Sequence, residues 1–350
     1  RRRRGQARGA DPHHRDRPRT PVHLSPRPRL GCRIVTASQS SPGSGGGGFR
    51  VSFLGLGTMG GPMCRRLVAA GYSVTAYDLD AAALAAAVDT GAVAAVSARD
   101  CALDADVFMT SLPGPPQVEA VMAGTGGALG AMRPGSVWVD LTTNSRELVL
   151  GLASVAPDGV AVVDSPVTGA VDGARRGELT LFVGGEPEPL AVVRPVLEHL
   201  GTVIECGPLG AGNVVKLVTN QLWFAAAAAL GEGFAVGLAN GVELRTLWEA
   251  VLNSVGDSFV ARHDAPSIFA GHYDPSFPLA LCVKDLGLLA DLEASVDADL
   301  PVTAAARSAF EWAAARYGLD AGEMCVARRI ADDARMSMQL EGDWTPHWER

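Results

Sequence analysis

Lysine is almost absent from this 350-residue sequence, because only two of its 30 lysine and arginine residues are lysines, Lys216 and Lys284. The chain is also rich in alanine, glycine and proline, a bias consistent with a GC-rich genome that turns indifferent basic positions into arginine. A lysine retained in this background is more often needed as lysine. Arginine stays protonated near neutral pH, whereas lysine can release its proton. The scarcity therefore indicates Lys216 and Lys284 as candidate chemical groups before any motif is considered.

Cysteine is scarce as well, and the six residues are scattered without a CxxC pair or a histidine at metal-ligand spacing. This pattern disfavours a disulfide framework and a zinc site, and it fits a reducing compartment. We expect no metal site and interpret the cysteines as small buried hydrophobic residues. They are Cys32, Cys64, Cys101, Cys206, Cys282 and Cys325.

Long apolar runs are also missing, since Gly, Asn, Glu or Arg interrupts each candidate before the roughly 20 residues of a membrane-spanning helix. Charge is distributed unevenly along the chain. Eleven arginines and two aspartates give residues 1–33 a charge of +9; because the whole chain has a net charge of −8, residues 34–350 have a net charge of −17. An acidic body repels nucleic acids and anionic membranes. The sequence therefore predicts a soluble globular protein with neither partner.

Residues 1–48 have few apolar side chains and no periodicity, which predicts a disordered segment. They contain no apolar core of a secretory signal. We interpret them as a non-native tail on a cytoplasmic protein, with Val35 at a plausible bacterial start. An Arg-rich organellar transit peptide is the alternative.

From Phe49 onwards, short apolar runs alternate with helix-length segments, which predicts a Rossmann-type, doubly wound parallel sheet in an α/β domain over residues 49–211. The strand signals stop near Cys206. The following sequence predicts helices almost throughout, so we expect an all-α substrate and dimerisation domain over 212–338 and a tail over 339–350. The boundary is expected at Gly210–Gly212.

A G-x-G-x-x-G pattern follows the first predicted strand and opens a helix, the context that a dinucleotide fingerprint requires. Its first glycine permits a tight turn, the second lets the backbone approach the pyrophosphate, and the third allows close packing of helix and strand. The alternative is a glycine-rich turn that binds nothing. The predicted cofactor-binding residues of this turn are Gly55, Leu56, Gly57, Thr58, Met59 and Gly60.

Asp78 ends the next predicted strand, eighteen residues beyond Gly60. A carboxylate there accepts hydrogen bonds from the adenosine ribose and repels a 2′-phosphate, so we expect NAD to be favoured over NADP. A helix N-cap is the alternative role of Asp78.

Lys216 and Asn220 lie four residues apart in a predicted helix, so both project from one face. Their neighbours in GAGNVVKLVTNQ are mainly apolar, which argues against a solvated surface lysine. We expect this face to be directed into the interdomain site.

Four ordered blocks give the chain a resemblance to the β-hydroxyacid dehydrogenases, the family of 3-hydroxyisobutyrate dehydrogenase and tartronate semialdehyde reductase. The resemblance covers about residues 49–335. The 6-phosphogluconate dehydrogenases are a similar alternative that also uses a lysine, but they are longer and need phosphate-binding basic residues that this sequence does not show. The blocks are FLGLGTMGGPM, DSPVTGAVDGARRGELTLFVGG, GAGNVVKLVTNQ and LCVKDLGLL.

The resemblance implies a role for each matching position. Lys216 matches the catalytic lysine, Asn220 the asparagine that orients it and the substrate, and Lys284 a lysine that contacts cofactor and substrate. The substrate carboxylate is expected at Thr168, Gly169 and Ala170, where Ser-Gly-Gly is usual. Loop positions beside the cofactor are Leu112, Pro113, Gln117 and Thr143. The resemblance also implies a homodimer or homotetramer.

The expected reaction is hydride transfer between a nicotinamide cofactor, NAD or else NADP, and a small 3-hydroxy acid or its semialdehyde. Lys216 must be partly neutral to take the hydroxyl proton, so its pKa should fall below the ordinary value through desolvation or a nearby charge such as Lys284. A related carbonyl or imine reductase and a non-catalytic NAD(P)-binding protein are the alternatives. The lysine argues against an imine reductase.

Overall fold

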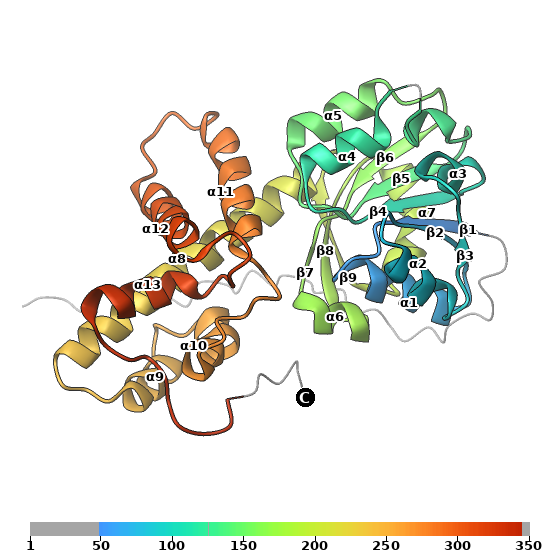
Figure 1. Ribbon diagram of the computed structural model, residues 1–350. Helices are drawn as coiled ribbons and strands as arrows, with labels where there is room; N and C mark the ends of the chain where they lie inside the picture. Colours follow the sequence, from blue (N-terminus) through green and yellow to red (C-terminus); the bar gives the residue numbers. More distant parts are fainter. Residues whose placement is uncertain (1–48, 125, 345–350) are drawn as a thin grey trace, which may run out of the picture. The chain divides into compact units, whose positions relative to one another are not determined.

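The computed structural model describes residues 49–124 and 126–344, and all of these belong to one compact unit (Figure 1). The interpretation of residues 1–48 as a leader or tail lies outside the described residues, as do Cys32 and residues 345–350.

The first half of the described chain forms a nine-stranded sheet with the order β3-β2-β1-β4-β5-β6-β8-β7, and β9 pairs with β8. The order reverses between β1 and β4, the position at which doubly wound sheets bind ligands beyond their strand ends. The strands are β1 Arg50–Leu54, β2 Ser73–Tyr77, β3 Val93–Ala94, β4 Val107–Thr110, β5 Val137–Asp140, β6 Ala161–Asp164, β7 Val167–Thr168, β8 Leu179–Gly184 and β9 Gly201–Gly207.

The sheet confirms the Rossmann-type expectation, with one correction. Each neighbouring pair of strands in the series β3-β2-β1-β4-β5-β6 is parallel. Strand β8, in contrast, runs antiparallel to β6 and β7. The chain turns back after β7 through the short α6, and β8 returns beside β7 in the opposite direction.

Side chains alternate across the central strands, so each strand serves two hydrophobic cores. Val51 and Phe53 of β1 pack with α1, α2 and α7 on one face, whereas Leu54 packs with α3, α4 and α5 on the other. This two-sided burial explains the nearly continuous apolar runs of the sequence. The helices are α1 Gly60–Ala69, α2 Ala81–Val88, α3 Ala98–Leu103, α4 Pro115–Met122, α5 Arg146–Ser154, α6 Ala170–Arg176 and α7 Pro187–Leu197, with the short turn η1 at Leu129–Ala131.

Helices make up the rest of the chain, as expected, and the long α8 (Ala211–Ala239) runs through the middle of them (Figure 1). Phe224 and Phe234 of α8 share a core with Phe269 and Phe310. The other helices are α9 Leu244–Leu252, the π-helical turn η2 Val260–Asp264, α10 Ala265–Ala270, α11 Leu279–Glu293, α12 Pro301–Tyr317 and α13 Cys325–Ala334.

Helix α8 corrects the expectation that no segment is apolar enough to cross a membrane. By length and composition alone, its 29 residues are long and apolar enough to cross a membrane. The helix forms because alanine and leucine favour helical backbone, and its Asn220 and Gln221 do not interrupt it. Its contacts with α9, α11, α12 and α13 make it the core helix of the helical region.

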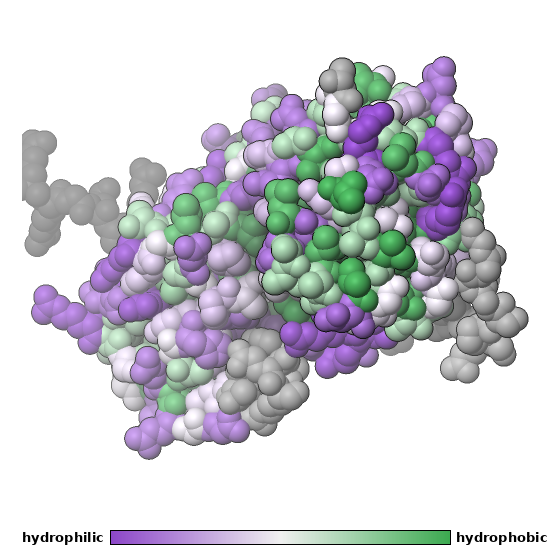
Figure 2. All heavy atoms as spheres, turned by 45° about the vertical axis from the view of Figure 1, so that its right-hand side comes forward, coloured by the Kyte–Doolittle hydropathy of each residue, from purple (hydrophilic) through white to green (hydrophobic). Residues whose placement is uncertain are grey.

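Apolar side chains also reach the surface of the Rossmann-type region. Leu79 and Val96 are 90% and 85% exposed near the β3 edge of the sheet. Figure 2 shows hydrophobic residues interspersed with hydrophilic ones over the face that is turned forward. Of the expected buried cysteines, four are buried, whereas Cys206 is only partly buried.

Candidate functional site

The glycine turn joins β1 to α1 at the reversal point of the sheet. Gly55 has a φ of +91°, and a side chain there would overlap the Ser111 carbonyl at the end of β4. A side chain at Gly60 would overlap the Gly55 carbonyl. A Cβ at Gly57, in contrast, would have nothing within 4 Å, so this part of the turn faces open space. The first and third glycines thus shape the turn, and the second leaves room for a ligand.

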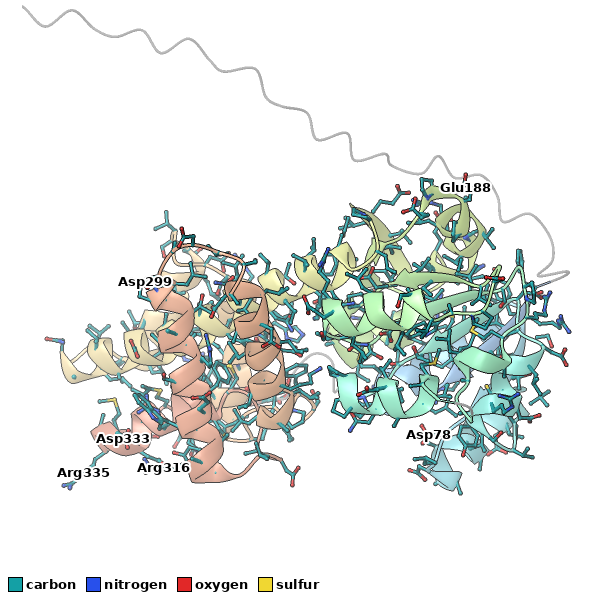
Figure 3. All side chains as sticks on the ribbon, turned by 90° about the horizontal axis from the view of Figure 1, so that it is seen from above. Asp78, Glu188, Asp299, Arg316, Asp333 and Arg335 are labelled. Atoms are coloured by element: carbon teal, nitrogen blue, oxygen red, sulfur yellow. The ribbon has the colours of Figure 1, made fainter. Side chains whose placement is uncertain are left out.

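Asp78 lies directly after β2, beside this turn (Figure 3). Its Oδ2 accepts a hydrogen bond from the Leu56 N–H at 2.5 Å, and its Oδ1 accepts one from the Asp80 N–H at 2.8 Å. The N-cap of α2 is Asp80, whose side chain accepts from Ala82 N. The structure therefore assigns the N-cap, the alternative role of Asp78, to a different residue.

The loops after β4 and β5 meet the glycine turn and each other. Leu112 contacts the Gly55 position, and its N–H donates to Thr142 Oγ1 at 3.1 Å. Thr143 follows and is partly buried, while Pro113 and Gln117 are exposed to solvent. The predicted cofactor residues that follow β1, β2, β4 and β5 thus lie at one edge of the sheet, and their open glycine turn fits a dinucleotide.

Lys216 and Asn220 lie on the same face of α8 and are both buried, at 7% and 3% exposure. The pKa of Lys216 is lowered to about 8, mainly because the amine is buried; the negative charge of Asp285 opposes this shift, and the positive charge of Lys284 adds to it. A lysine with this pKa is present in both protonation states near neutral pH, as a general acid or base requires.

Lys284 joins the helical region to the cofactor loops. Its Nζ donates to the Thr143 carbonyl at 3.1 Å and lies 2.9 Å from Asp285 Oδ1. The stem of Lys284 packs against Gly114, where a Cβ would lie 2.8 Å from Lys284 Cδ.

Asp285 is a site residue that the sequence analysis missed. It is 3% exposed, and its Oδ2 accepts a hydrogen bond from Asn220 Nδ2 at 2.7 Å. It connects Asn220 to Lys284 and is the anion that keeps the Lys216 pKa from falling further. A carboxylate directly after a rare lysine in the apolar helix LCVKDLGLL was the available signal.

Thr168 is the last residue of β7, Gly169 follows it, and Ala170 is the first residue of α6; Gly169 and Ala170 are exposed. In the described part of the chain, Thr168 forms no hydrogen bond with Lys216 or Asn220. The three predicted substrate residues are therefore adjacent to one another but are not hydrogen-bonded to the lysine in this structure. Ala170 has a φ of +57°, a region that L-residues other than glycine rarely adopt.

Replacing Ala170 with glycine should stabilise the protein, because it removes the left-handed strain of an L-residue at this φ. We expect a net gain of about 0.5–1 kcal/mol and a rise in Tm of a few degrees, measured by calorimetry. Ala174→Gly in the same helix is the matched control and should have the opposite sign. A lower Tm for Ala170→Gly would contradict the strained conformation.

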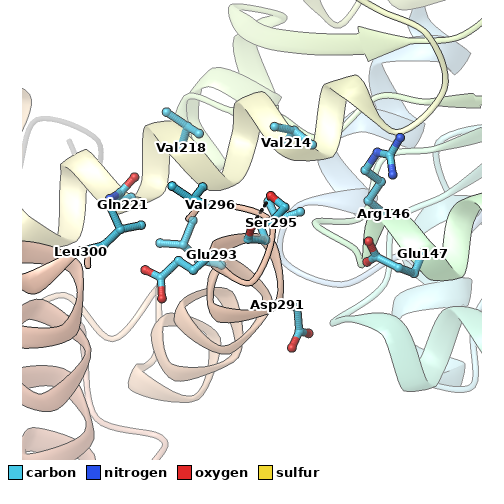
Figure 4. Close-up of a pocket in the computed structure, with 12 residues that line it drawn as sticks. Arg146, Glu147, Val214, Val218, Gln221, Asp291, Glu293, Ser295, Val296 and Leu300 are labelled. Carbon is cyan, nitrogen blue, oxygen red and sulfur yellow. Dashed lines mark hydrogen bonds between the residues drawn. The ribbon is translucent and has the colours of Figure 1, made fainter. Parts of the chain in front are cut away.

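A cavity of about 360 Å³ lies on the other side of α8 (Figure 4). Val214, Val218 and Gln221 line it, and these positions are about 140–160° around the helix from Lys216. Arg146 and Glu147 line one end. The cavity is thus distinct from the lysine face.

Comparisons with known proteins identify the family of the chain. Residues 50–209 match the model of the NAD binding domain of 6-phosphogluconate dehydrogenase, and residues 210–330 match that of the NAD-binding domain of NADP-dependent 3-hydroxyisobutyrate dehydrogenase. The chain is 35% identical over 269 residues to 3-hydroxyisobutyrate dehydrogenase of Pseudomonas aeruginosa, covering 74% of this chain and 90% of the relative. This chain belongs to the β-hydroxyacid dehydrogenase family.

Other relatives extend the comparison. The chain is 36% identical over 284 residues to 2-(hydroxymethyl)glutarate dehydrogenase of Eubacterium barkeri, covering 80% of this chain and 94% of the relative. The solved structure of Mycobacterium tuberculosis 3-hydroxyisobutyrate dehydrogenase with L-serine has a TM-score of 0.74 and 30% identity, covering 81% and 99% of the two chains. An imine reductase from Myxococcus stipitatus, at 19% identity and a TM-score of 0.54, shares the fold alone. The protein is thus an NAD(P)-dependent hydroxy acid dehydrogenase.

Proposed function

We propose that this family member transfers a hydride between NAD and a small 3-hydroxy acid, or its semialdehyde in reverse, with Lys216 as the general acid and base. The observation that carries this proposal is a buried lysine with a pKa of about 8, held beside Asn220 and Asp285 and linked through Lys284 to the cofactor loop at Thr143.

The cofactor residues have separate tasks in this proposal. Asp78 accepts hydrogen bonds from the ribose hydroxyls and excludes a 2′-phosphate, which favours NAD over NADP. The open backbone at Gly57 and Thr58 receives the pyrophosphate, and the tight turn places Leu56 and Met59 around it. The loop residues Leu112, Pro113, Gln117 and Thr143 flank the nicotinamide, which when bound accepts the hydride.

The chain's own residues carry the proton. In the oxidation direction, neutral Lys216 takes the hydroxyl proton as the carbonyl forms, and in reduction its protonated form returns that proton. Asn220, held by Asp285, orients the hydroxyl, and the positive charge of Lys284 attracts the substrate carboxylate. Thr168, Gly169 and Ala170 bind the far side of that carboxylate.

The substrate class rests on the relatives, which are named for 3-hydroxyisobutyrate, 2-(hydroxymethyl)glutarate and L-serine. All three names describe acids with a primary alcohol close to a carboxylate. The test is NAD and NADP reduction on a panel of such acids in parallel with secondary hydroxy acids and cyclic amines. Turnover of cyclic amines would favour an imine reductase, and cofactor binding without any turnover would favour a non-catalytic protein.

The rate of alcohol oxidation should rise with pH through about 8 and then level off, because only neutral Lys216 accepts the proton. The reverse reaction should fall over the same range, since it needs the protonated amine. The measurement is kcat/KM of both directions from pH 6 to 10 with cofactor saturating. If kcat/KM changed with pH in the same direction for oxidation and reduction, the result would contradict this role of Lys216.

We also infer a cytoplasmic homodimer or homotetramer with residues 49–211 as the cofactor domain and 212–338 as the helical domain. Helix α8 supports an additional subunit contact, since Val218 and Leu222, one turn apart on it, are 43% and 66% exposed. No charged residue occurs between Leu217 and Gly231. An exposed apolar stripe of this length fits a second copy of the chain. Sedimentation analysis measures the assembly.

A further inference from the structure

Helix α8 begins against a buried carboxylate that comes from the sheet. The Oδ1 atom of Asp164, at the end of β6, accepts from the Gly210 N–H at 2.7 Å. Its Oδ2 accepts from the N–H of Asn213 at 2.7 Å and from Asn213 Nδ2 at 3.1 Å. Asp164 thus caps the helix from 46 and 49 residues away, in place of a local N-cap side chain.

The contact continues from Asn213 into the loop after β5. Asn213 Oδ1 accepts from the Asn144 N–H at 2.7 Å, and Asn144 Nδ2 donates to Asp140 Oδ2 at 2.8 Å. Asp140 and Asp164 are register partners on adjacent parallel strands. Asp140, Asn144, Asp164 and Asn213 are each 0% exposed.

The same chain of hydrogen bonds reaches the cofactor loops. Asp140 Oδ1 accepts from Thr110 Oγ1 at 2.9 Å and from the Thr142 N–H at 3.1 Å, and Thr142 Oγ1 in turn holds the Leu112 N–H. The carbonyl of Thr143, between Thr142 and Asn144, accepts from Lys284. The network therefore connects the loops at Leu112 and Thr143 to Asn213, which lies three residues before Lys216 in α8.

The start of α8 is packed too tightly against the end of β6 for the helix to shift there. A Cβ at Gly212 would overlap the Phe182 carbonyl and lie 2.9 Å from Asp164 Oδ2, and one at Gly184 would overlap Asp164 Oδ1. Burial raises the pKa of Asp164 to about 6, with a contribution from Asp140, while its hydrogen bonds to Gly210 and Asn213 oppose the rise. Near neutral pH the carboxylate is thus ionised where the positive end of α8 favours an anion.

We propose that Asp164, Asn213 and Asn144 are positioning residues, whose buried network sets Lys216 relative to the cofactor loops. The inference rests on the proposed role of Lys216. Hydride and proton must be transferred from one carbon and its hydroxyl, so the lysine and the loops have to keep a common geometry. A displacement of about 1 Å in such an arrangement can lower the rate about 100-fold.

The test is Asn213→Ala, with Asn240→Ala as the matched control, because Asn240 is an exposed residue at the other end of the same helix. We expect Asn213→Ala to lower kcat about 10–100-fold while the NADH Kd, measured by fluorescence, stays within about threefold. The kinetic pKa near 8 should rise towards the ordinary lysine value, since a loosened first turn admits water to Lys216. Asn144→Ala should act in the same direction.

A merely structural role would lower Tm but leave kcat and this pKa unchanged, and that result would overturn the proposal. Because the chain has two lysines, the pKa of Lys216 can also be followed by NMR of the ¹³C-dimethylated protein, without any turnover. An unmoved Lys216 resonance in Asn213→Ala overturns the positioning role. A shifted resonance in a protein that oxidises no hydroxy acid supports it and contradicts the proposed function instead.

Discussion

Replacing Lys216 with arginine should abolish turnover, with kcat reduced by about 10³-fold or more, while NAD binding remains nearly intact. Arginine keeps the positive charge but cannot release a proton near neutral pH, so the alcohol loses its base. Lys216 is also absent from the glycine turn and the loops after β4 and β5, and its loss should therefore leave cofactor binding unchanged. The measurements are kcat for the best substrate and NADH Kd by fluorescence titration.

Lys284→Arg is the comparison for this variant. It retains a charge beside Thr143 and Asp285, so we expect mainly a higher KM with a smaller loss of kcat. Lys216→Met separates the loss of a base from the bulk of the guanidinium and should be equally inactive. Turnover of Lys216→Arg within tenfold of the parent protein would refute the assignment of the base.

The second prediction with a large effect is that two substitutions in the glycine turn separate NAD binding from folding stability. Gly57→Ala should weaken NAD binding by at least tenfold with little change in Tm, because its Cβ enters open space where the backbone meets the pyrophosphate. Gly55→Ala should lower Tm strongly, since Gly55 has a φ of +91° and its Cβ would overlap the Ser111 carbonyl. Thermal unfolding and NADH titration of the two variants measure both effects.

The pair is informative because the two substitutions are chemically identical and two residues apart. If Gly57→Ala bound NAD as tightly as the parent protein, the pyrophosphate would have to lie elsewhere. If instead Gly57→Ala lowered Tm as much as Gly55→Ala, the conclusion that Gly57 faces open space would be wrong.

The order of strands and helices was predictable because each element carries its own periodicity. The glycine turn between β1 and α1 and the long α8 were both expected from local pattern. Strand β3 was not expected, since it has only two residues. The antiparallel direction of β8 was also missed, because a short apolar run does not show in which direction its strand runs in the sheet.

The hydrogen bond between Asn220 and Asp285 was likewise not predictable from local sequence patterns. Their side chains meet across 65 residues, and Lys284 reaches Thr143 across 141. Neither separation leaves a local pattern. The scarcity of lysine still indicated both cationic partners, because composition records a chemical requirement whatever the fold.

The sequence by itself determined the Rossmann-type order, the cofactor turn and the two lysines, because spacing and residue type act over a few neighbouring residues. Only the tertiary structure decided the pKa of Lys216, which depends on burial and on charges from a different helix. It also decided that Asp164 of the sheet caps the lysine helix. Electrostatics and hydrogen bonding act through space, and the fold alone sets those distances.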